Sequence, residues 1–191
     1  MTQPSLNFRL ATPQDGPALL SIYEPYITTS VTSEYTLPSL EEFTNRITDR
    51  QEVYPYVVCE LDGRPVGYSY ASRLFTRKAY DWTVELSVYC EQGHRGLGIG
   101  RTMYTKVMNI LKEQHVVSAF AKVITPNPGS DALHRSMGFE LVGTLRSLGY
   151  KEGWRDVHLY EIQFGDLTAA PEPFIPLKDV PKDTINTILS H

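Results

Sequence analysis

The chain has 191 residues, 41% of them hydrophobic, and a formal net charge of −4, which predicts one compact domain with a sizeable core. The mild acidity argues against a nucleic-acid binder, because such proteins are more often basic. No apolar run approaches the roughly 20 residues of a membrane span, and segment 1–15 lacks a stretch of signal-peptide length, so we expect a cytoplasmic protein without a membrane partner.

The N-terminal part predicts a short strand and two helices. Asn7–Leu10 is the strand, and Thr12-Pro13-Gln14-Asp15 starts a helix, because threonine can cap and proline suits the first turn. Ser39-Leu40-Glu41-Glu42 is a capping box that opens the second helix. A polar linker, Ser30–Pro38, joins the two helices. The residues expected on the inner face of the second helix are Leu40, Phe43 and Ile47.

The next part predicts a hairpin and a third strand. Tyr56–Leu61 and Pro65–Ser72 flank Asp62-Gly63, a dipeptide typical of tight hairpin turns. Trp82–Cys90 alternates, which places its apolar residues on one face of the strand. Glu85 is therefore a carboxylate in mid-strand that points away from the apolar set.

Ser87–Gln114 predicts a strand, a glycine loop and a helix. Glycines in Gly93–Arg101 allow close approach to main-chain N–H groups at a helix start, where an anion is favoured. A dinucleotide fingerprint would need glycine where the chain has Arg101, and a phosphate-binding P-loop would need lysine where it has Ile99. The loop therefore predicts a phosphate site of another kind.

The C-terminal part predicts three more strands and a short helix. Ser118–Ile124 is an apolar strand, a short helix ends at Gly138, and two strands follow at Leu141–Leu148 and Val157–Phe164. We expect residues 1–164 to form a single domain. Residues 165–191 form a proline-containing tail that either packs over the domain or extends from it.

Two motifs carry a resemblance to a known family. Arg95-x-x-Gly98-x-Gly100 resembles the pyrophosphate signature of the GNAT superfamily of N-acetyltransferases. The block Tyr80-Asp81-Trp82-Thr83-x-Glu85, followed by Ser87-Val88-Tyr89, resembles the phosphinothricin acetyltransferase-like branch, and the likeness extends from about Leu6 to Phe164. The resemblance implies an α+β fold in α/β/α layers, with a mixed, mostly antiparallel central sheet that splays at the cofactor site.

The resemblance implies acetyl-CoA as co-substrate. The spacing of the histidines suggests no metal site, so we predict none. The main chain of Val88 and Cys90 would hold the pantetheine arm. Asn127 and Ser130 would reach the cofactor from the far strand and helix, the alternative being a helix cap. The residues expected around the pyrophosphate are Arg95, Gly96, Gly98, Ile99, Gly100 and Arg101.

Acetyl transfer to an amine needs a base and a proton for the departing thiolate. An amino group near pKa 8 or above arrives mostly charged at neutral pH, so a positioned carboxylate is useful, and Glu85 is the candidate. The alternative is a solvated strand residue. His134 lies where the resemblance implies a proton-carrying residue, and it could serve the amine or the thiolate. Its alternative is a surface histidine.

The acceptor is the least constrained part of the prediction. Arg77 and Tyr80 adjoin the catalytic strand, and Glu34 and Tyr35 lie in the linker that would border the acceptor site. The resemblance implies a small amino-acid-like amine, of the phosphinothricin or methionine sulfoximine type, and a homodimer. A protein or peptide N-acetyltransferase, which would need an open groove at Glu34 and Tyr35, and a non-catalytic acyl-CoA-binding module are the alternatives.

Overall fold

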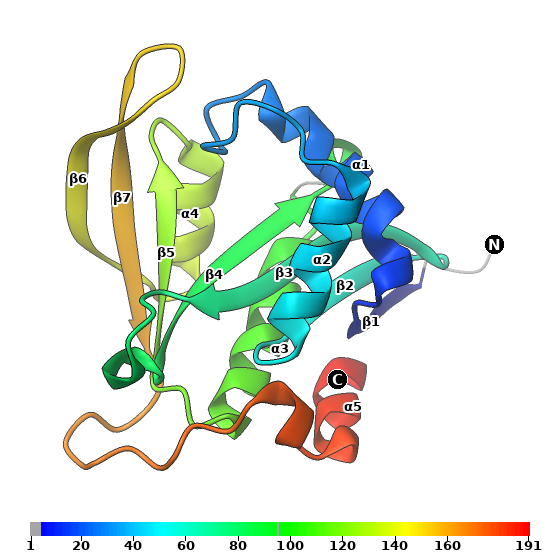
Figure 1. Ribbon diagram of the computed structural model, residues 1–191, viewed down its shortest axis with the longest axis vertical. Helices are drawn as coiled ribbons and strands as arrows, with labels where there is room; N and C mark the ends of the chain where they lie inside the picture. The colour runs from blue at the N-terminus through cyan, green and yellow to red at the C-terminus, as the bar shows by residue number, and fades with distance from the viewer. Residues whose placement is uncertain (1–4, 95) are drawn as a thin grey trace.

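The computed structural model describes residues 5–94 and 96–191, so Arg95, predicted to bind pyrophosphate, lies outside the described residues. Its centre is a seven-stranded sheet of order β1-β2-β3-β4-β5-β7-β6 (Figure 1). Every neighbouring pair is antiparallel except β4 and β5. The strands are β1 Leu6–Leu10, β2 Tyr56–Leu61, β3 Arg64–Arg73, β4 Thr83–Cys90, β5 Ser118–Ile124, β6 Glu140–Tyr150 and β7 Trp154–Gln163.

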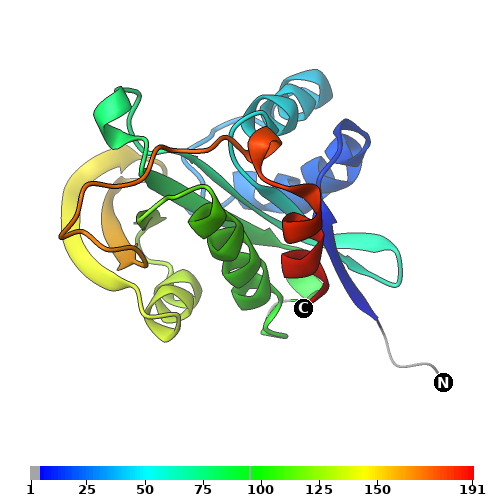
Figure 2. The ribbon, with the colours of Figure 1, turned by 90° about the horizontal axis from the view of Figure 1, so that it is seen from below.

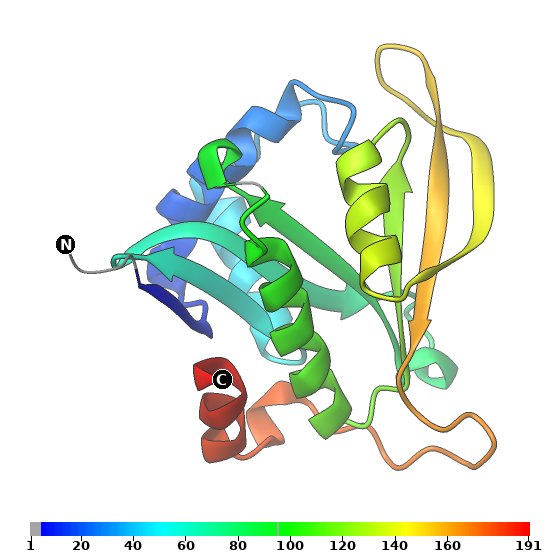
Figure 3. The ribbon, with the colours of Figure 1, turned by 180° about the vertical axis from the view of Figure 1, so that it is seen from behind.

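Helices cover both faces of the sheet, which gives three layers (Figures 1 and 3). α1 Gly16–Ile27 and α2 Leu40–Gln51 lie on one face. α3 Ile99–Glu113 and α4 Pro128–Ser136 lie on the other, together with α5 Lys182–Ser190, which packs on α3 and β1 (Figure 2). The predicted α+β fold with a mixed sheet is confirmed.

The parallel pair β4–β5 separates soon after it begins. Its pairing covers Thr83 with Ser118, Val84 with Ala119 and Glu85 with Phe120. Beyond Glu85 the two strands diverge, as Figure 1 shows, while β4 stays paired with β3 and β5 with β7. A wedge therefore opens in the middle of the sheet, as the family resemblance implies.

The alternation along β4 assigns each side of the strand a role. Val84 and Leu86 are buried in the core under α3. Glu85 and Ser87 point the other way, into a cavity beneath the α1–α2 layer. The strand thus has an apolar face toward α3 and a polar face toward the cavity.

Two local predictions are wrong. Leu40 is 46% exposed, because it is the first residue of α2 and precedes the turn that meets the core at Phe43 and Ile47. The last two strands were also predicted to end at Leu148 and to begin at Val157, whereas β6 continues to Tyr150 and β7 begins at Trp154. The Lys151 N–H donates to the Gly153 carbonyl at 2.9 Å, which closes the short turn between them.

The C-terminal tail packs on the domain and ends in a helix. Leu177, Ile185 and Leu189 are buried in the main core. The buried ammonium of Lys106 in α3 donates to the carbonyls of Ile188 and Leu189 at 3.0 and 2.9 Å, which ties α5 down. Burial also lowers the Lys106 pKa.

Candidate active site

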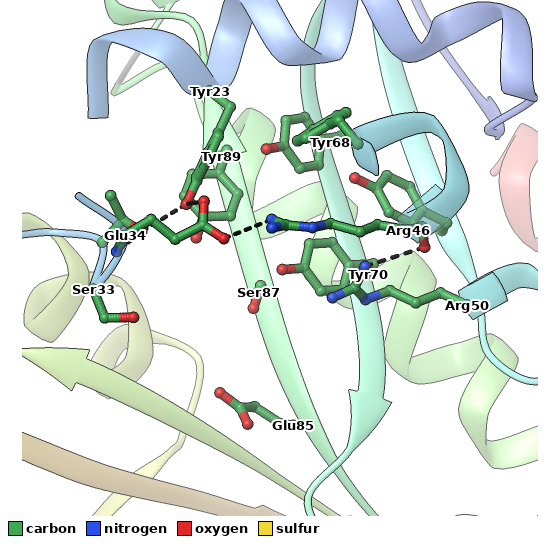
Figure 4. A pocket seen from close by; sticks show the side chains of 13 residues that line it. Tyr23, Ser33, Glu34, Arg46, Arg50, Tyr68, Tyr70, Glu85, Ser87 and Tyr89 are labelled. Atoms are coloured by element: carbon green, nitrogen blue, oxygen red, sulfur yellow. Dashed lines mark hydrogen bonds and ion pairs between the residues drawn. The ribbon is translucent and has the colours of Figure 1, made fainter. Parts of the chain in front are cut away.

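A cavity of about 270 Å³ lies between the α1–α2 layer and strands β2, β3 and β4 (Figure 4). We call it the tyrosine cavity. It is also lined by Ser87 of β4, Ser33 and Glu34 of the α1–α2 linker, and Arg46 and Arg50 of α2. The tyrosines that line it are Tyr23, Tyr56, Tyr68, Tyr70 and Tyr89.

Arg46 and Glu34 form an ion pair across the cavity, with Nη1 and Oε1 2.7 Å apart. Arg46 also pairs with Glu42 at 2.6 Å, and the Tyr23 hydroxyl donates to the other Glu34 oxygen at 2.9 Å. Both charges are therefore partnered. The linker carboxylate is held in place by α1 and α2 together.

Arg50 differs from Arg46 in its partners. Its guanidinium lies 4.6 Å from the centre of the Tyr70 ring, and its Nη1 donates to the Arg46 carbonyl at 3.1 Å. Within the described part of the chain it makes no ion pair. A cation without a counter-ion thus lines this cavity.

The tyrosine hydroxyls remain donors at neutral pH. Burial raises the pKa of Tyr56, Tyr68 and Tyr89 well above the usual value. None of these three hydroxyls bonds to another described residue. None of them is among the fully inaccessible polar atoms, and all three tyrosines line the cavity. They are therefore available to a molecule inside the cavity.

Glu85 lies at the junction with the wedge in the sheet. Its side chain lines the tyrosine cavity, and its Oε2 is 2.7 Å from Nζ of Lys122 on β5. Its side chain is 22% exposed, so it is neither a freely solvated strand residue nor a core residue. A carboxylate in this position can take a proton from a molecule in the cavity.

A second cavity, of about 70 Å³, lies between the diverging strands, and we call it the splay cavity. Ser87 and Tyr89 line both cavities, so the two meet along β4. The Glu91 N–H donates to Val66 of β3 at 2.8 Å, and pairing alternates along an antiparallel strand. The N–H and C=O of Val88 therefore face the splay cavity.

The main chain of Cys90 has the same orientation but a different environment. The Tyr26 hydroxyl donates to the Cys90 carbonyl at 2.6 Å, and the Cys90 N–H points to the same hydroxyl at 3.2 Å. A ligand strand that bonds to Cys90 has to share these groups with Tyr26. Val88 is the better placed of the two predicted residues.

His134 lies at the base of the splay cavity and is only 2% exposed, so the surface alternative is wrong. Its Nδ1 is 2.7 Å from the Ser130 carbonyl, which only accepts, so Nδ1 carries the proton. Nε2 then accepts from the Tyr104 hydroxyl at 3.3 Å. Burial lowers the His134 pKa and raises that of Tyr104, which favours this neutral pair.

The glycine loop leads into α3 as predicted. Gly96 and Gly98 both have φ of +79°, a conformation in which a side chain is strained. Gly98 is the N-cap, so the amides of Ile99, Gly100 and Arg101 lie in the first turn of α3, where N–H groups lack helical partners. The Arg101 guanidinium donates to the Ser136 carbonyl at 3.0 Å, which links α3 to α4.

Asn127 and Ser130 line the splay cavity but are already engaged with each other. Asn127 is the N-cap of α4, and its Oδ1 accepts from the Ser130 N–H at 3.2 Å. The capping alternative is what the structure shows. A role toward a cofactor stays a prediction for both.

Three predicted acceptor residues lie away from the tyrosine cavity. Arg77 and Tyr80 lie in the β3–β4 connection, where Tyr80 is 45% exposed and packs on Phe75. Tyr35 is 66% exposed, and its hydroxyl donates to the carbonyl of Tyr150 in β6. Of the predicted acceptor residues, Glu34 is the one that lines this cavity.

The sequence analysis missed several residues that form the two cavities. Arg46 and Arg50 are four residues apart and follow Phe43 and Ile47 at helical spacing, so the pattern places all four on one side of α2. Tyr104 belongs to the segment Met103-Tyr104-Thr105, which resembles the branch, but no role was predicted for it, and Lys122 carried no signal beyond its place in a strand. The partners that reveal them come from other elements.

In the described part of the chain, no helix is long and apolar enough to cross a membrane. Within the same residues, His, Cys, Asp and Glu side chains form no group of three or more that could hold a metal ion.

The splayed sheet, the glycine-lined start of α3 and a carboxylate at the wedge are the features of an acyl-group transferase. A family model described as "Acetyltransferase (GNAT) domain" matches residues 8–159. The chain belongs to this family, and the predicted N-acetyltransferase is confirmed.

Comparison with individual proteins narrows the branch. A phosphinothricin N-acetyltransferase of Streptomyces viridochromogenes is 37% identical over 177 residues, which is 92% of this chain and 96% of that protein. Among solved structures, a phosphinothricin acetyltransferase of Sinorhizobium meliloti in complex with acetyl-CoA matches with a TM-score of 0.84 and 30% identity, over 95% of this chain and 100% of that chain. A ribosomal-protein-alanine N-acetyltransferase of Brucella melitensis matches with a TM-score of 0.79 and 35% identity, over 82% of this chain and 99% of that chain.

Proposed function

We propose that this protein transfers the acetyl group of acetyl-CoA to the α-amine of a small amino-acid-like acceptor, of the phosphinothricin or methionine sulfoximine type. The transfer is a direct attack in a ternary complex. The observation that carries the proposal is the meeting of two cavities at Ser87 and Tyr89, with Glu85 beside the junction. An amine and a thioester can be brought together there.

The residues of the splay cavity fit acetyl-CoA. The Val88 N–H and C=O offer the bonds of an added strand, and the N-terminal amides of α3 offer donors to a pyrophosphate. Gly96 and Gly98, whose positive φ shapes this loop, leave space where a Cβ would otherwise stand. When bound, acetyl-CoA supplies the activated acetyl group.

Glu85 is the proposed base. An acceptor amine near its usual pKa is mostly protonated at neutral pH, and it attacks only after losing that proton. The carboxylate lines the cavity where the acceptor binds and takes the proton directly or through one water. The neighbouring Lys122 ammonium, 2.7 Å away, holds the carboxylate at the mouth of the wedge.

Tyr104 and His134 are proposed to stabilise the thiolate that departs when the C–S bond breaks, through a hydrogen bond from the Tyr104 hydroxyl to the sulfur, and the thiolate then takes its proton from water. Tyr104 lines the splay cavity, and its hydroxyl donates to Nε2 of His134. His134 therefore acts through Tyr104 as a positioning residue, because its own proton lies on Nδ1 against the Ser130 carbonyl. The sequence predicted a proton-carrying role for His134, and we propose this positioning role in its place.

A small acceptor fits better than a protein acceptor, because the linker beside the cavity is tied down. The Lys151 ammonium from the β6–β7 turn donates to the carbonyls of Ile27, Thr32 and Glu34 at 2.8, 3.0 and 2.7 Å. Tyr35 adds a bond to β6 from the same linker. These hydrogen bonds hold the linker against the β6–β7 turn, where a peptide acceptor would need an open groove.

The test is thiol release from acetyl-CoA with a panel of acceptors. The panel contains free amino acids, phosphinothricin, methionine sulfoximine and short peptides. We expect release with the free amino-acid-like compounds and little with the peptides. Release with peptides alone would support the protein N-acetyltransferase, and tight acetyl-CoA binding without release in any case would support a binding module.

We also propose a homodimer formed through the sheet edge at β6. This strand lies at the end of the sheet and leaves apolar side chains exposed, an arrangement that favours pairing with another chain. Sedimentation of the full chain tests this, and Leu145→Asp should shift a dimer toward monomer. The exposed apolar residues are Leu141, Val142, Leu145 and Leu148.

A further inference from the structure

We propose that Arg50 binds an oxyanion of the acceptor, so that the enzyme selects amines that carry an acidic group. This inference rests on the proposed function, because it assigns a role within the acceptor site. It gives the tyrosine cavity a specificity-determining residue on α2. That residue lies outside the block of sequence that resembles the branch most closely.

The charges that line the cavity leave Arg50 without a counter-ion. Arg46 is paired with Glu34 at 2.7 Å, and Glu85 is paired with Lys122 at 2.7 Å. Arg50 makes no ion pair with the described residues, although it lines the same cavity. A carboxylate or phosphinate that enters the cavity can therefore bind the Arg50 guanidinium without first displacing a carboxylate of the protein.

The position of Arg50 is fixed before a ligand arrives. Its Nη1 donates to the Arg46 carbonyl at 3.1 Å, and its guanidinium stacks 4.6 Å above the Tyr70 ring centre. Both contacts leave further N–H groups on the fork for an oxyanion. Figure 4 shows the guanidinium directed toward the tyrosine rings and into the cavity.

The hydroxyls around Arg50 suit the same ligand. Burial keeps Tyr56 and Tyr68 protonated by raising their pKa, so both can donate to an oxyanion. Neither bonds to another described residue. Tyr56 stacks on Tyr70 with ring centres 4.9 Å apart, and Arg50 covers the same Tyr70 ring, so the two groups lie beside one ring.

The strand beside Arg50 suits the amine. Arg50 lies on the last turn of α2 and covers Tyr70 of β3, and Tyr70 is paired with Ser87 of β4, two residues from Glu85. Glu85 and Ser87 lie at the junction with the splay cavity. A zwitterionic acceptor that spans the cavity places its anion at Arg50 and its amine at Glu85. Peptide N-termini and simple amines lack the anion at that place.

The experiment compares Arg50→Gln with wild type, using full-length protein and steady-state kinetics. We expect the KM for an acidic acceptor to rise about 10- to 100-fold, the range for losing hydrogen bonds to a charged group. The KM for acetyl-CoA should not change. Arg64→Gln, which removes an exposed arginine paired with Glu91, is the matched control and should leave both constants unchanged.

Substrate analogues show which of the acceptor's two anionic groups, the α-carboxylate or the side-chain anion, binds Arg50. Phosphinothricin is compared with its α-carboxamide and with methionine sulfone, which keeps the α-carboxylate and has no side-chain anion. If Arg50 binds the α-carboxylate, the KM for the carboxamide should be the same in Arg50→Gln and in wild type. If Arg50 binds the side-chain anion, the KM for methionine sulfone should be the same in both proteins instead.

Arg50 also stabilises the end of α2, so a structural role has to be separated from binding. Arg50→Lys keeps a cation at the helix end, and it should retain the unfolding midpoint but recover only part of the KM. An unchanged KM in a folded Arg50→Gln protein would overturn the inference, as would an equal KM rise for all acceptors. Wild-type protein that acetylates no amino-acid-like acceptor would instead contradict the proposed function.

Discussion

The tyrosine cavity and the splay cavity share the strand β4 but offer different groups to a ligand. The splay cavity, about 70 Å³, presents main-chain groups of Val88, and the first amides of α3 lie at a separate site that the glycine loop leads into. The tyrosine cavity, about 270 Å³, presents side chains from α1, α2, the linker and three strands. Recognition on the splay side thus depends on main-chain groups, whereas on the other side it depends on which side chains line the cavity.

The largest expected effect comes from the carboxylate between the two cavities. Glu85→Gln should lower kcat for acetyl transfer by about 10²- to 10⁴-fold, the usual contribution of a general base. The affinity for acetyl-CoA should be retained, because Glu85 lines the acceptor side. Thiol-release kinetics and calorimetric titration with acetyl-CoA measure the two quantities.

Glu161→Gln is the matched control for this variant, since Glu161 is a mid-strand glutamate of β7 that lines neither cavity. It should keep full activity. Full activity of Glu85→Gln between pH 6 and 9 would show that another group removes the proton.

The next effect concerns the splay side. Tyr104→Phe should lower kcat by about 10- to 50-fold, less than the loss at Glu85, because a thiolate with pKa near 8.5 leaves without full protonation. The KM for the acceptor should stay the same, because Tyr104 lines the splay cavity and not the tyrosine cavity. Pre-steady-state measurements of thiol release report the step directly.

A control for Tyr104→Phe is Tyr160→Phe, which alters a buried tyrosine stacked on His134 but outside the two cavities. Equal losses in both variants would indicate that packing around His134, and not the Tyr104 hydroxyl, matters for the rate.

A smaller effect is expected at the glycine loop. Gly98→Ala should raise the Kd for acetyl-CoA by about 5- to 10-fold, because alanine at φ +79° costs about 1 kcal/mol or more and shifts the first amides of α3. Gly93→Ala is the matched control, since Gly93 has no positive φ and open space around it. Equal affinities for the two variants would mean that the Gly98 conformation is not needed for binding.

The same contrast explains which parts of the molecule could be predicted from the sequence. Glycines that require positive φ and an alternating strand are local signals, so the glycine loop, β4 and the mid-strand position of Glu85 were all predicted. The wedge followed from the family resemblance, and the structure shows why it exists. The pairing of β4 with β5 stops at Glu85 and Phe120.

Side chains that meet from distant elements gave no such signal. Arg50 and Tyr70 are on α2 and β3, and their contact depends on the packing of the helix over the sheet. The burial of His134 depends on Tyr104 and Tyr160 in the same way. A helical pattern predicts one polar face and one apolar face, but it does not reveal what covers each face.

The C-terminal helix is an intermediate case. Ile185, Ile188 and Leu189 recur at helical spacing, so a local signal for α5 was present. The prolines before it dominated the prediction, which was a proline-containing tail without a named helix. The buried Lys106 could not be predicted, because its partners are the carbonyls at the far end of the chain.

The smallest expected effect is a pH dependence of stability on the splay side. Burial lowers the pKa of His134 below its usual 6.5, so the folded protein keeps the ring neutral while the unfolded chain takes up a proton as the pH falls below about 6.5. The unfolded state then binds more protons, and the free energy of unfolding decreases. Above that pH the contribution of His134 is complete and constant.

Urea unfolding between pH 5.5 and 8 should therefore show a midpoint that falls on the acid side in wild type and falls less in His134→Gln. His115→Gln, which changes a partly exposed histidine bonded to the Pro173 carbonyl, should keep the wild-type slope. If His134→Gln kept that slope as well, the ring would be taking up its proton in the folded protein, and the neutral Tyr104–His134 pair would be the wrong description of this cavity.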